Sequence, residues 1–292
     1  MSELTFQAMG SPVHVIVTGD PRLLHGARRM VEDLEAKWSR FLPSSELSRL
    51  NEAGSAVVSW ETIVLVERAI EGWRASEGRF DPTVLDALVT HGYDRSFESV
   101  PARVGFGGTR PAPGCEGIVV AHDARVVALP EGVHLDPGGI GKGLAADLVV
   151  CQLMADGAAG AMVSIGGDLR AEGDPPRGSA WSVAIDEPAA GGYFGTVSMT
   201  AGAVATSTTR TIRWTVDGET VHHLIDPRQG RSVAGGVVLA TVVAAEGWWA
   251  EVATKDLIGK DPGTEGLEET AGLVVTADGG VRLVGGMEAY LS

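Results

Sequence analysis

The sequence predicts an α+β fold in which largely antiparallel sheets carry helices that are inserted singly. From residue 118 onward, short apolar runs typical of strands follow one another with turn residues between them, whereas helical periodicity is confined to isolated segments. Asp217-Gly218, between two such runs, is a strong signal for a two-residue hairpin turn. Strands that succeed one another as hairpins favour an antiparallel arrangement over a doubly wound parallel sheet.

The N-terminal part alternates strand and helix signals. Residues 13–18 are predicted as a strand, and residues 22–38 as a helix because their apolar side chains recur at helical spacing. The polar stretch 43–51 is predicted as a turn whose hydroxyl and amide side chains suit caps or ligand contacts. A second amphipathic helix is expected to begin after Ser59.

The C-terminal part is predicted to consist mainly of strands. They are expected at residues 118–121, 125–129, 161–165, 181–186, 195–199, 211–216, 220–225, 237–244, 273–276 and 281–284. One helix is expected at about 246–258. We expect residues 1–292 to form a single functional unit, with two intimately packed α+β lobes as the alternative.

Composition excludes several classes of protein. The 292 residues carry a formal net charge of −15, which disfavours a nucleic acid or an anionic membrane as partner. The two cysteines, Cys115 and Cys151, are too few for a disulfide framework or a zinc cluster, and we expect both to be core thiols.

The N-terminus has no basic region followed by an apolar one, and no cysteine that could form a lipobox. No run of 18 apolar residues occurs, so no transmembrane segment is expected. We therefore expect a cytoplasmic protein.

The most informative stretch is Asp136-Pro137-Gly138-Gly139-Ile140-Gly141-Lys142-Gly143, which continues into a helical pattern. Its four glycines let backbone N–H groups approach a ligand at a helix N-terminus, where phosphate is favoured, and Lys142 adds a cation. The run matches neither the P-loop nor the GxGxxG pattern. A phosphate-binding turn and a turn that packs a helix closely onto a strand are therefore both open.

A second candidate is the segment from His222 to Asp226, where a predicted strand enters a turn. A histidine near an aspartate at a strand end is well placed to act as a general base. The alternative is a histidine that stabilises the turn.

Two further polar segments are candidates for ligand contacts. Asp168 comes after Gly166-Gly167, where its carboxylate suits either a ligand contact or an Asx turn. The segment 205–210 offers four hydroxyl groups and a cation, which suits ligand contacts, although threonine is also common on edge strands.

Glu251 and Lys255 lie four residues apart on the predicted last helix and hence on one face. From the spacing alone, an exposed helical ion pair is the expected arrangement.

Taken together, these segments resemble the ApbE family, the FAD:protein FMN transferases. The motifs that carry the resemblance keep their order along nearly the whole chain: Ala8-Met9-Gly10, Ser39 to Asn51, Gly78 to Val84, Asp136 to Gly143 with Asp147, Val163 to Asp168, Ala205 to Ser207, and His223 to Pro227. The resemblance implies the ApbE-like (T-fold-like) form of the α+β class. It also implies transfer of the FMN part of FAD to a threonine hydroxyl of a flavoprotein acceptor, with release of AMP. Hydrolysis of FAD to FMN and AMP is an alternative, as is an FAD-binding or FAD-delivering protein with reduced catalysis.

The resemblance also implies roles for individual residues. His223 would be the base for the acceptor hydroxyl, and Asp226 would fix the local turn. Asp136 and Lys142 would hold the ligand beside the glycine turn. The cofactor-binding residues carried over by position are Met9, Gly10, Phe41, Ser48, Asn51, Phe80, Asp81, Asp136, Gly138, Lys142, Gly167, Asp168, Thr206, Ser207, Ile225 and Lys255.

The sequence departs from the family at the metal site. The family usually presents a helical Asp and, four residues on, a Thr, together with a backbone carbonyl from the glycine-rich turn. Here the matching positions are Glu251, Lys255 and Gly139. An ammonium group cannot ligate a metal, so either Mg²⁺ binds weakly with fewer protein ligands or Lys255 supplies positive charge to the pyrophosphate. We favour the second expectation; a shift of one residue would offer Thr254 instead.

Overall fold

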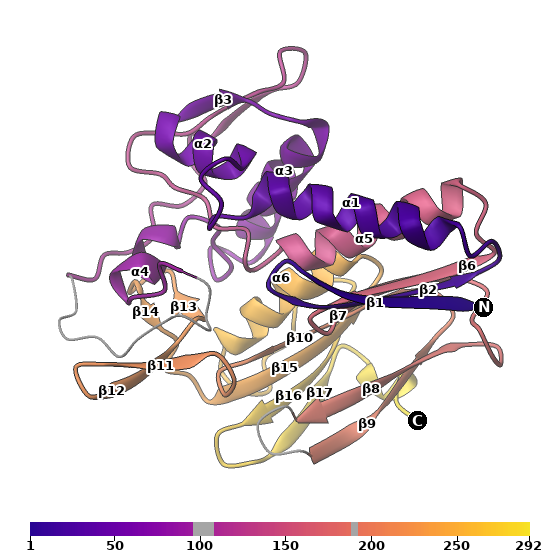
Figure 1. Cartoon of the computed structure of the whole chain (residues 1–292). Helices are drawn as coiled ribbons and strands as arrows, with labels where there is room; N and C mark the ends of the chain where they lie inside the picture. Colours follow the sequence, from indigo (N-terminus) through magenta and orange to yellow (C-terminus); the bar gives the residue numbers. More distant parts are fainter. Residues whose placement is uncertain (96–107, 188–191) are drawn as a thin grey trace. The chain divides into compact units, whose positions relative to one another are not determined.

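The computed structural model describes residues 1–95, 108–187 and 192–292 (Figure 1). They form two compact units: the first comprises residues 1–35, 140–208 and 236–292, and the second residues 36–139 and 209–235. The expectation of one functional unit stays a prediction.

An eight-stranded sheet forms the centre of the first unit, in the order β1-β2-β6-β7-β10-β15-β16-β17. Its strands are β1 (Ser2–Ala8), β2 (Ser11–Thr18), β6 (Gly160–Ile165), β7 (Asp168–Gly173), β10 (Gly202–Thr208), β15 (Val237–Ala244), β16 (Ala271–Thr276) and β17 (Val281–Val284). Every neighbouring pair is antiparallel. The predicted α+β class is therefore confirmed.

Helices cover one face of this sheet and a hairpin covers the other (Figure 1). On the first face lie α5 (Gly141–Ala155) and α6 (Gly247–Ile258), and α1 (Leu23–Trp38) belongs to this unit up to residue 35. On the other face the hairpin of β8 (Trp181–Glu187) and β9 (Gly192–Met199) encloses an apolar core together with the 3₁₀ helix η2 (Met287–Ala289).

The N-terminal turns of α5 and α6 meet at two glycines and cap each other. The Asp147 carboxylate of α5 accepts the N–H groups of Gly247 and Trp248 at 2.7 and 2.9 Å. The Glu251 carboxylate of α6 accepts the Gly143 N–H at 2.8 Å. Each carboxylate follows its own helix's glycine by four residues, so both helix starts are stabilised by the same spacing.

Replacing Gly143 by alanine is expected to push the two helices apart, because the new Cβ would lie 2.3 Å from the Gly247 carbonyl oxygen. We expect a loss of about 1–3 kcal/mol in the free energy of unfolding, measured by urea denaturation. Gly26 of α1 is the matched control: nothing lies within 4 Å of a Cβ there, and Gly26→Ala should gain up to about 1 kcal/mol. A Gly143→Ala protein as stable as the parent would contradict the close helix contact.

The second unit is built from short elements around a smaller core. Its helices are α2 (Glu46–Ala53), α3 (Trp60–Ala75) and α4 (Leu85–Thr90). Its strands are β3 (Ser55–Val57), β4 (Val119–Ala121) and β5 (Val126–Ala128) in one sheet, the pair β11 (Arg213–Val216) and β12 (Glu219–His222), and the pair β13 (Ile225–Asp226) and β14 (Arg231–Ser232). Ser45 and Ser59 cap α2 and α3, which confirms a helix start after Ser59.

Three of the expectations about secondary structure and cysteine burial are wrong. The turn predicted at 43–51 becomes helix α2 from Glu46, because Ser45 provides its cap and Leu47 and Leu50 bury one face. The strand predicted at 220–225 ends at His222, where both backbone groups of that residue bond the Ser232 hydroxyl. Cys115 is buried as expected, but Cys151 lies on the exposed side of α5.

Strands β1, β7 and β10 were not among the predicted elements, although all three belong to the central sheet. Within the part of the chain that the structure describes, no helix has the length and apolar character needed to cross a bilayer.

Candidate active site

Four charged side chains of the first unit form one buried cluster. Lys142 in the first turn of α5 contacts the carboxylate of Asp168, the first residue of β7, and lies 3.2 Å from Glu251 Oε1. Lys255 Nζ lies 3.4 Å from the same Glu251 oxygen. Lys142, Asp168, Glu251 and Lys255 are called the charge cluster below; it joins the glycine run to a strand end and to α6.

The two carboxylates of the charge cluster are more deeply buried than its two lysines. The side chains of Glu251 and Asp168 are 0% and 4% exposed, whereas Lys142 and Lys255 keep 26% and 15% of theirs open. An exposed helical ion pair was therefore the wrong expectation for Glu251 and Lys255. The tertiary packing of α6 against β10 and β15 places this helix face inside.

The charged groups of the cluster shift one another's pKa values. Burial alone would raise the pKa of Glu251, but Lys142, Lys255 and the Gly143 N–H keep it below its ordinary value. Burial alone would lower the pKa of Lys142, but Asp168 and Glu251 hold it above its ordinary value. Burial lowers the pKa of Lys255, and the two carboxylates oppose that lowering. Lys142 is thus a firmly held cation at the start of α5.

The hydroxyl groups at the end of β10 bond to neighbouring elements of the first unit. Thr206 Oγ1 bonds the Thr241 hydroxyl at 2.9 Å, and its backbone N–H donates to Asp168 Oδ1 at 3.1 Å. Ser207 Oγ bonds Thr254 Oγ1 at 2.7 Å, and Thr254 Oγ1 donates to the Glu251 carbonyl, also at 2.7 Å. Thr208 donates to the Val238 carbonyl. These contacts place Asp168 between the glycine run and β10.

The first part of the glycine run belongs to the second unit. Arg40 Nε forms an ion pair with Asp136 Oδ1 at 2.8 Å, and the Gly138 N–H donates a hydrogen bond to Asp136 Oδ2 at 3.1 Å. A Cβ on Gly138 would lie 2.8 Å from that oxygen, so a side chain at this position would push the Asp136 carboxylate aside. The Asn51 amide exchanges two 2.8 Å hydrogen bonds with the backbone of Leu135. The turn is therefore anchored on both sides of Asp136.

Arg40 is a site residue that the sequence reading did not single out. Its side chain is 8% exposed and its guanidinium lies 4.3 Å from the Phe41 ring centre and 4.6 Å from that of Tyr93. Its Nη1 donates to the Tyr93 carbonyl, and its buried Nη2 has no hydrogen-bond partner among the residues that the structure describes. The available signal was its place directly before Phe41 in a polar motif. Arg40 holds Asp136 and presents a spare donor beside it.

Other residues predicted to bind cofactor differ in exposure. Phe41 is 40% exposed, whereas Phe80 is 3% and Asp81 6% exposed. The Asp81 carboxylate accepts the backbone and hydroxyl groups of Thr83, which forms an Asx turn, and burial raises the pKa of Asp81. The Ser48 hydroxyl donates to the Ser39 carbonyl.

The two adjacent histidines have different surroundings. His222 is 9% exposed, bonds the Val233 carbonyl through Nε2 at 3.1 Å, and stabilises the turn towards β14. His223 lies outside the strands, between β12 and β13, and is only partly buried. The turn-stabilising alternative therefore describes His222, and the catalytic role of His223 stays a prediction.

Acidification is expected to destabilise the fold through His222. Burial, aided by Arg213, lowers the pKa of His222, while the Val233 carbonyl opposes this. The unfolded chain then binds a proton at a higher pH than the folded chain, so stability present above the ordinary histidine pKa is lost as the pH falls. The slope from one proton is at most about 1.4 kcal/mol per pH unit. Denaturation between about pH 7.5 and pH 5.5 should show a shallower loss for His222→Gln than for the parent protein.

Asp226 organises the turn after His223. Its carboxylate accepts the Arg228 backbone N–H at 2.9 Å and the Gln229 side chain at 2.7 Å, and its carbonyl accepts the Gly230 N–H. Ile225, one residue before, is 9% exposed. These bonds fix the chain that leaves His223.

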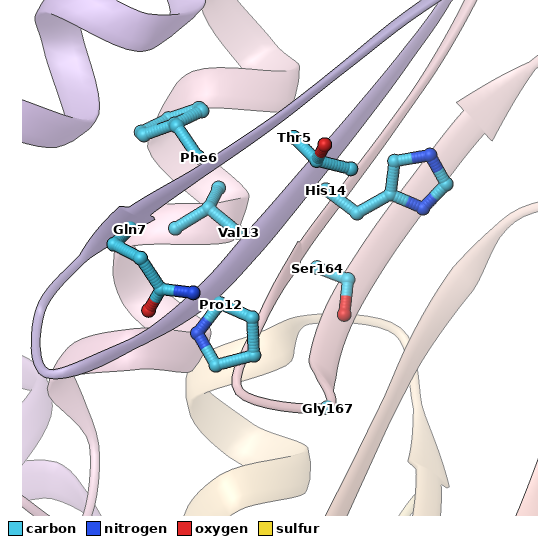
Figure 2. A pocket seen from close by; sticks show the side chains of 8 residues that line it. All are labelled: Thr5, Phe6, Gln7, Pro12, Val13, His14, Ser164 and Gly167. Atoms are coloured by element: carbon cyan, nitrogen blue, oxygen red, sulfur yellow. The ribbon is translucent and has the colours of Figure 1, made fainter.

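Met9 and Gly10 form the two-residue turn between β1 and β2, both with positive φ, as a type I′ turn requires. Beside it, a hollow of about 460 Å³ lies over β1, β2 and β6 (Figure 2). Its lining residues are Thr5, Phe6, Gln7, Pro12, Val13, His14, Ser164 and Gly167. Gly167 alone of the predicted cofactor-binding residues lines it, so the hollow does not coincide with the charge cluster.

Solved structures of ApbE proteins share this fold. The ApbE protein of Thermotoga maritima superposes with a TM-score of 0.85 at 23% identity, covering 100% of this chain and 99% of its own. The flavinyl transferase ApbE of Pseudomonas stutzeri gives a TM-score of 0.80 at 22% identity, covering 99% of this chain and 96% of its own. The architecture is thus that of the ApbE flavin transferases.

The ApbE family model matches residues 9–273, and the chain belongs to the ApbE family. The FAD:protein FMN transferase of Vibrio cholerae is 31% identical over 222 residues, which make up 74% of this chain and 66% of that relative. The FAD:protein FMN transferase of Salmonella typhimurium is 28% identical over 72% of this chain and 64% of its own length. The chain thus spans just under two thirds of these two relatives. With the one of Haemophilus influenzae it is 26% identical over 95% of this chain and 87% of that relative.

Proposed function

We propose that this protein transfers the FMN part of FAD to a threonine hydroxyl of a flavoprotein acceptor and releases AMP. Relatives named FAD:protein FMN transferase support the reaction. The observation that carries the proposal is the position of Lys142: a held cation in the first turn of α5, within the glycine run. A helix N-terminus with an adjacent ammonium group attracts a pyrophosphate.

The proposed step is an in-line phosphoryl transfer. The threonine oxygen forms a bond to the phosphorus on the FMN side, and the bond from that phosphorus to the bridging oxygen breaks. AMP leaves with the bridging oxygen. His223 accepts the proton of the threonine hydroxyl and returns it to AMP or to solvent. Such reactions depend on positioning and charge neutralisation, which Lys142 and the first turn of α5 supply.

Phe41 and Asp136 are proposed to contact FAD, as the resemblance to the ApbE family implies. Phe41 offers an exposed aromatic ring, and Asp136 a carboxylate whose orientation Arg40 and Gly138 fix. Asp226 keeps His223 in place through the turn that follows it. Hydrolysis of FAD by water at the same phosphorus needs the same residues and is the natural side reaction.

A second candidate function is FAD binding or delivery with little catalysis. It is favoured by the charge balance of the cluster, in which two carboxylates offset the two ammonium groups. Less net positive charge then faces the leaving group.

The test is to incubate the purified protein with FAD and a peptide that contains an acceptor threonine. Release of AMP together with FMN on the peptide is the expected result. AMP with free FMN would replace transfer by hydrolysis, and tight FAD binding without AMP would establish the binding function instead. A protein that neither binds FAD nor releases AMP would refute the proposal.

A further inference from the structure

In this chain, the carboxylate that matches the family's metal ligand already has partners at both of its oxygens. Glu251 Oε1 lies 3.2 Å from Lys142 Nζ and 3.4 Å from Lys255 Nζ, and Glu251 Oε2 accepts the Gly143 N–H at 2.8 Å. The side chain has no exposed surface. A metal ion at Glu251 would therefore have to compete with partners at both oxygens of a buried side chain.

The surroundings of Glu251 do not suit Mg²⁺. Mg²⁺ requires a near-octahedral shell of oxygen atoms at about 2.0–2.1 Å. Here two ammonium groups approach Glu251 on one side, and ammonium groups repel a cation. Among the described residues, no group of three or more His, Cys, Asp or Glu side chains is arranged to hold a metal.

The threonine next to Lys255 does not replace the missing ligand. Thr254 is completely buried, its hydroxyl proton goes to the Glu251 carbonyl, and the hydroxyl also bonds Ser207. It therefore stabilises the contact between α6 and β10. The residues present do not fit a divalent metal.

We infer that Lys255 is the resident cation of this site, and that the chain binds FAD and transfers FMN without a divalent metal ion. Through Glu251, Lys255 is held beside Lys142 and the first turn of α5, and part of its side chain remains open to a ligand. The Glu251 carboxylate, four residues before Lys255 on the same helix face, is enough to hold the ammonium group in place, whereas a metal ion at this position would need further ligands. The part of this inference that concerns FMN transfer rests on the proposed function; the part that concerns metal binding does not.

The deciding variant is Glu251→Asp combined with Lys255→Thr. It removes the ammonium group of Lys255 and provides two side chains with oxygen ligands. The probe is the metal alone: MgCl₂ in isothermal titration calorimetry, and Mn²⁺ followed by electron paramagnetic resonance. We expect no saturable binding by the parent protein and saturable binding by the double variant. Circular dichroism and thermal unfolding establish that the variant is folded, and Mg²⁺ should raise its unfolding temperature.

Lys260→Thr is the matched control. Lys260 pairs with buried Asp256 at 2.7 Å with the same four-residue spacing, so this variant removes an equivalent lysine elsewhere on the same segment. It should bind no metal and should bind FAD like the parent. Lys255→Met, in contrast, should weaken FAD binding at least tenfold, as measured by quenching of flavin fluorescence.

Saturable Mg²⁺ binding by the parent protein would overturn the inference, and so would a folded double variant that binds none. Where FMN transfer is observed, EDTA should leave the parent rate within about twofold and should slow the double variant at least tenfold. A parent protein without transferase activity would refute only the proposed function. The metal titrations would still test whether Lys255 takes the place of a metal ion.

Discussion

Replacement of His223 by alanine is expected to slow FMN transfer about 10²–10⁴-fold, which is the range that a positioned general base contributes. His223 lies between β12 and β13 and is partly buried, and Asp226 fixes the turn behind it. Because the proposed base acts only on the acceptor hydroxyl, the affinity for FAD should stay within about twofold of the parent's. Single-turnover release of AMP and a fluorescence titration with FAD measure the two quantities.

The control for this prediction is the neighbouring histidine. His222→Gln should keep the transfer rate, because His222 is buried and bonds the Val233 carbonyl and Ser232. Equal losses in both variants would indicate a structural effect and contradict the role of His223 as the base. An unchanged rate in His223→Ala would contradict it directly.

Replacement of Lys142 by methionine is expected to have the largest effect on stability. The substitution leaves the buried carboxylates of Asp168 and Glu251 without their shared cation. Removal of one partner from a buried ion pair costs about 3–5 kcal/mol. Urea denaturation should show this loss, and the affinity for FAD should fall as well, because Lys142 is the proposed contact of the pyrophosphate.

A second substitution makes this prediction specific to the charge cluster. Asp168→Asn keeps an oxygen that accepts the Thr206 N–H but removes one negative charge. The double variant Lys142→Met/Asp168→Asn should therefore be more stable than Lys142→Met alone. Arg22→Met, which removes an ion pair whose arginine is 88% exposed, should leave stability unchanged. Additive losses at 142 and 168 would show that the two residues are not coupled.

Local sequence signals predicted much of the secondary structure. Ser59 before an apolar periodic segment marked the start of α3, and Asp217-Gly218 marked the turn between β11 and β12. The predicted strand 237–244 coincides with β15. Such signals depend only on residues that are close in sequence, and the local structures that they predict are kept in the folded protein.

The sequence was less informative where a contact spans the chain. Asp147 and Gly247 are 100 positions apart, and Gly143 and Glu251 are 108 apart, yet they cap each other's helices. Arg40 is not remarkable in the sequence, and its pairing with Asp136 emerges only from the fold of the second unit. Spacing within one helix could place Glu251 and Lys255 on one face, but it could not tell that this face is buried.

By itself, the sequence determined the α+β class and the order of the ApbE motifs, because both follow from residue type and spacing. It also places Lys255 at the position where the resemblance to the family implies a threonine. Only the tertiary structure shows what Lys255 contacts. The packing of α6 against the sheet buries Glu251, and burial forces its carboxylate to find partners inside the protein. Those partners are Lys142, Lys255 and the Gly143 N–H, brought together from two helices that lie far apart in sequence.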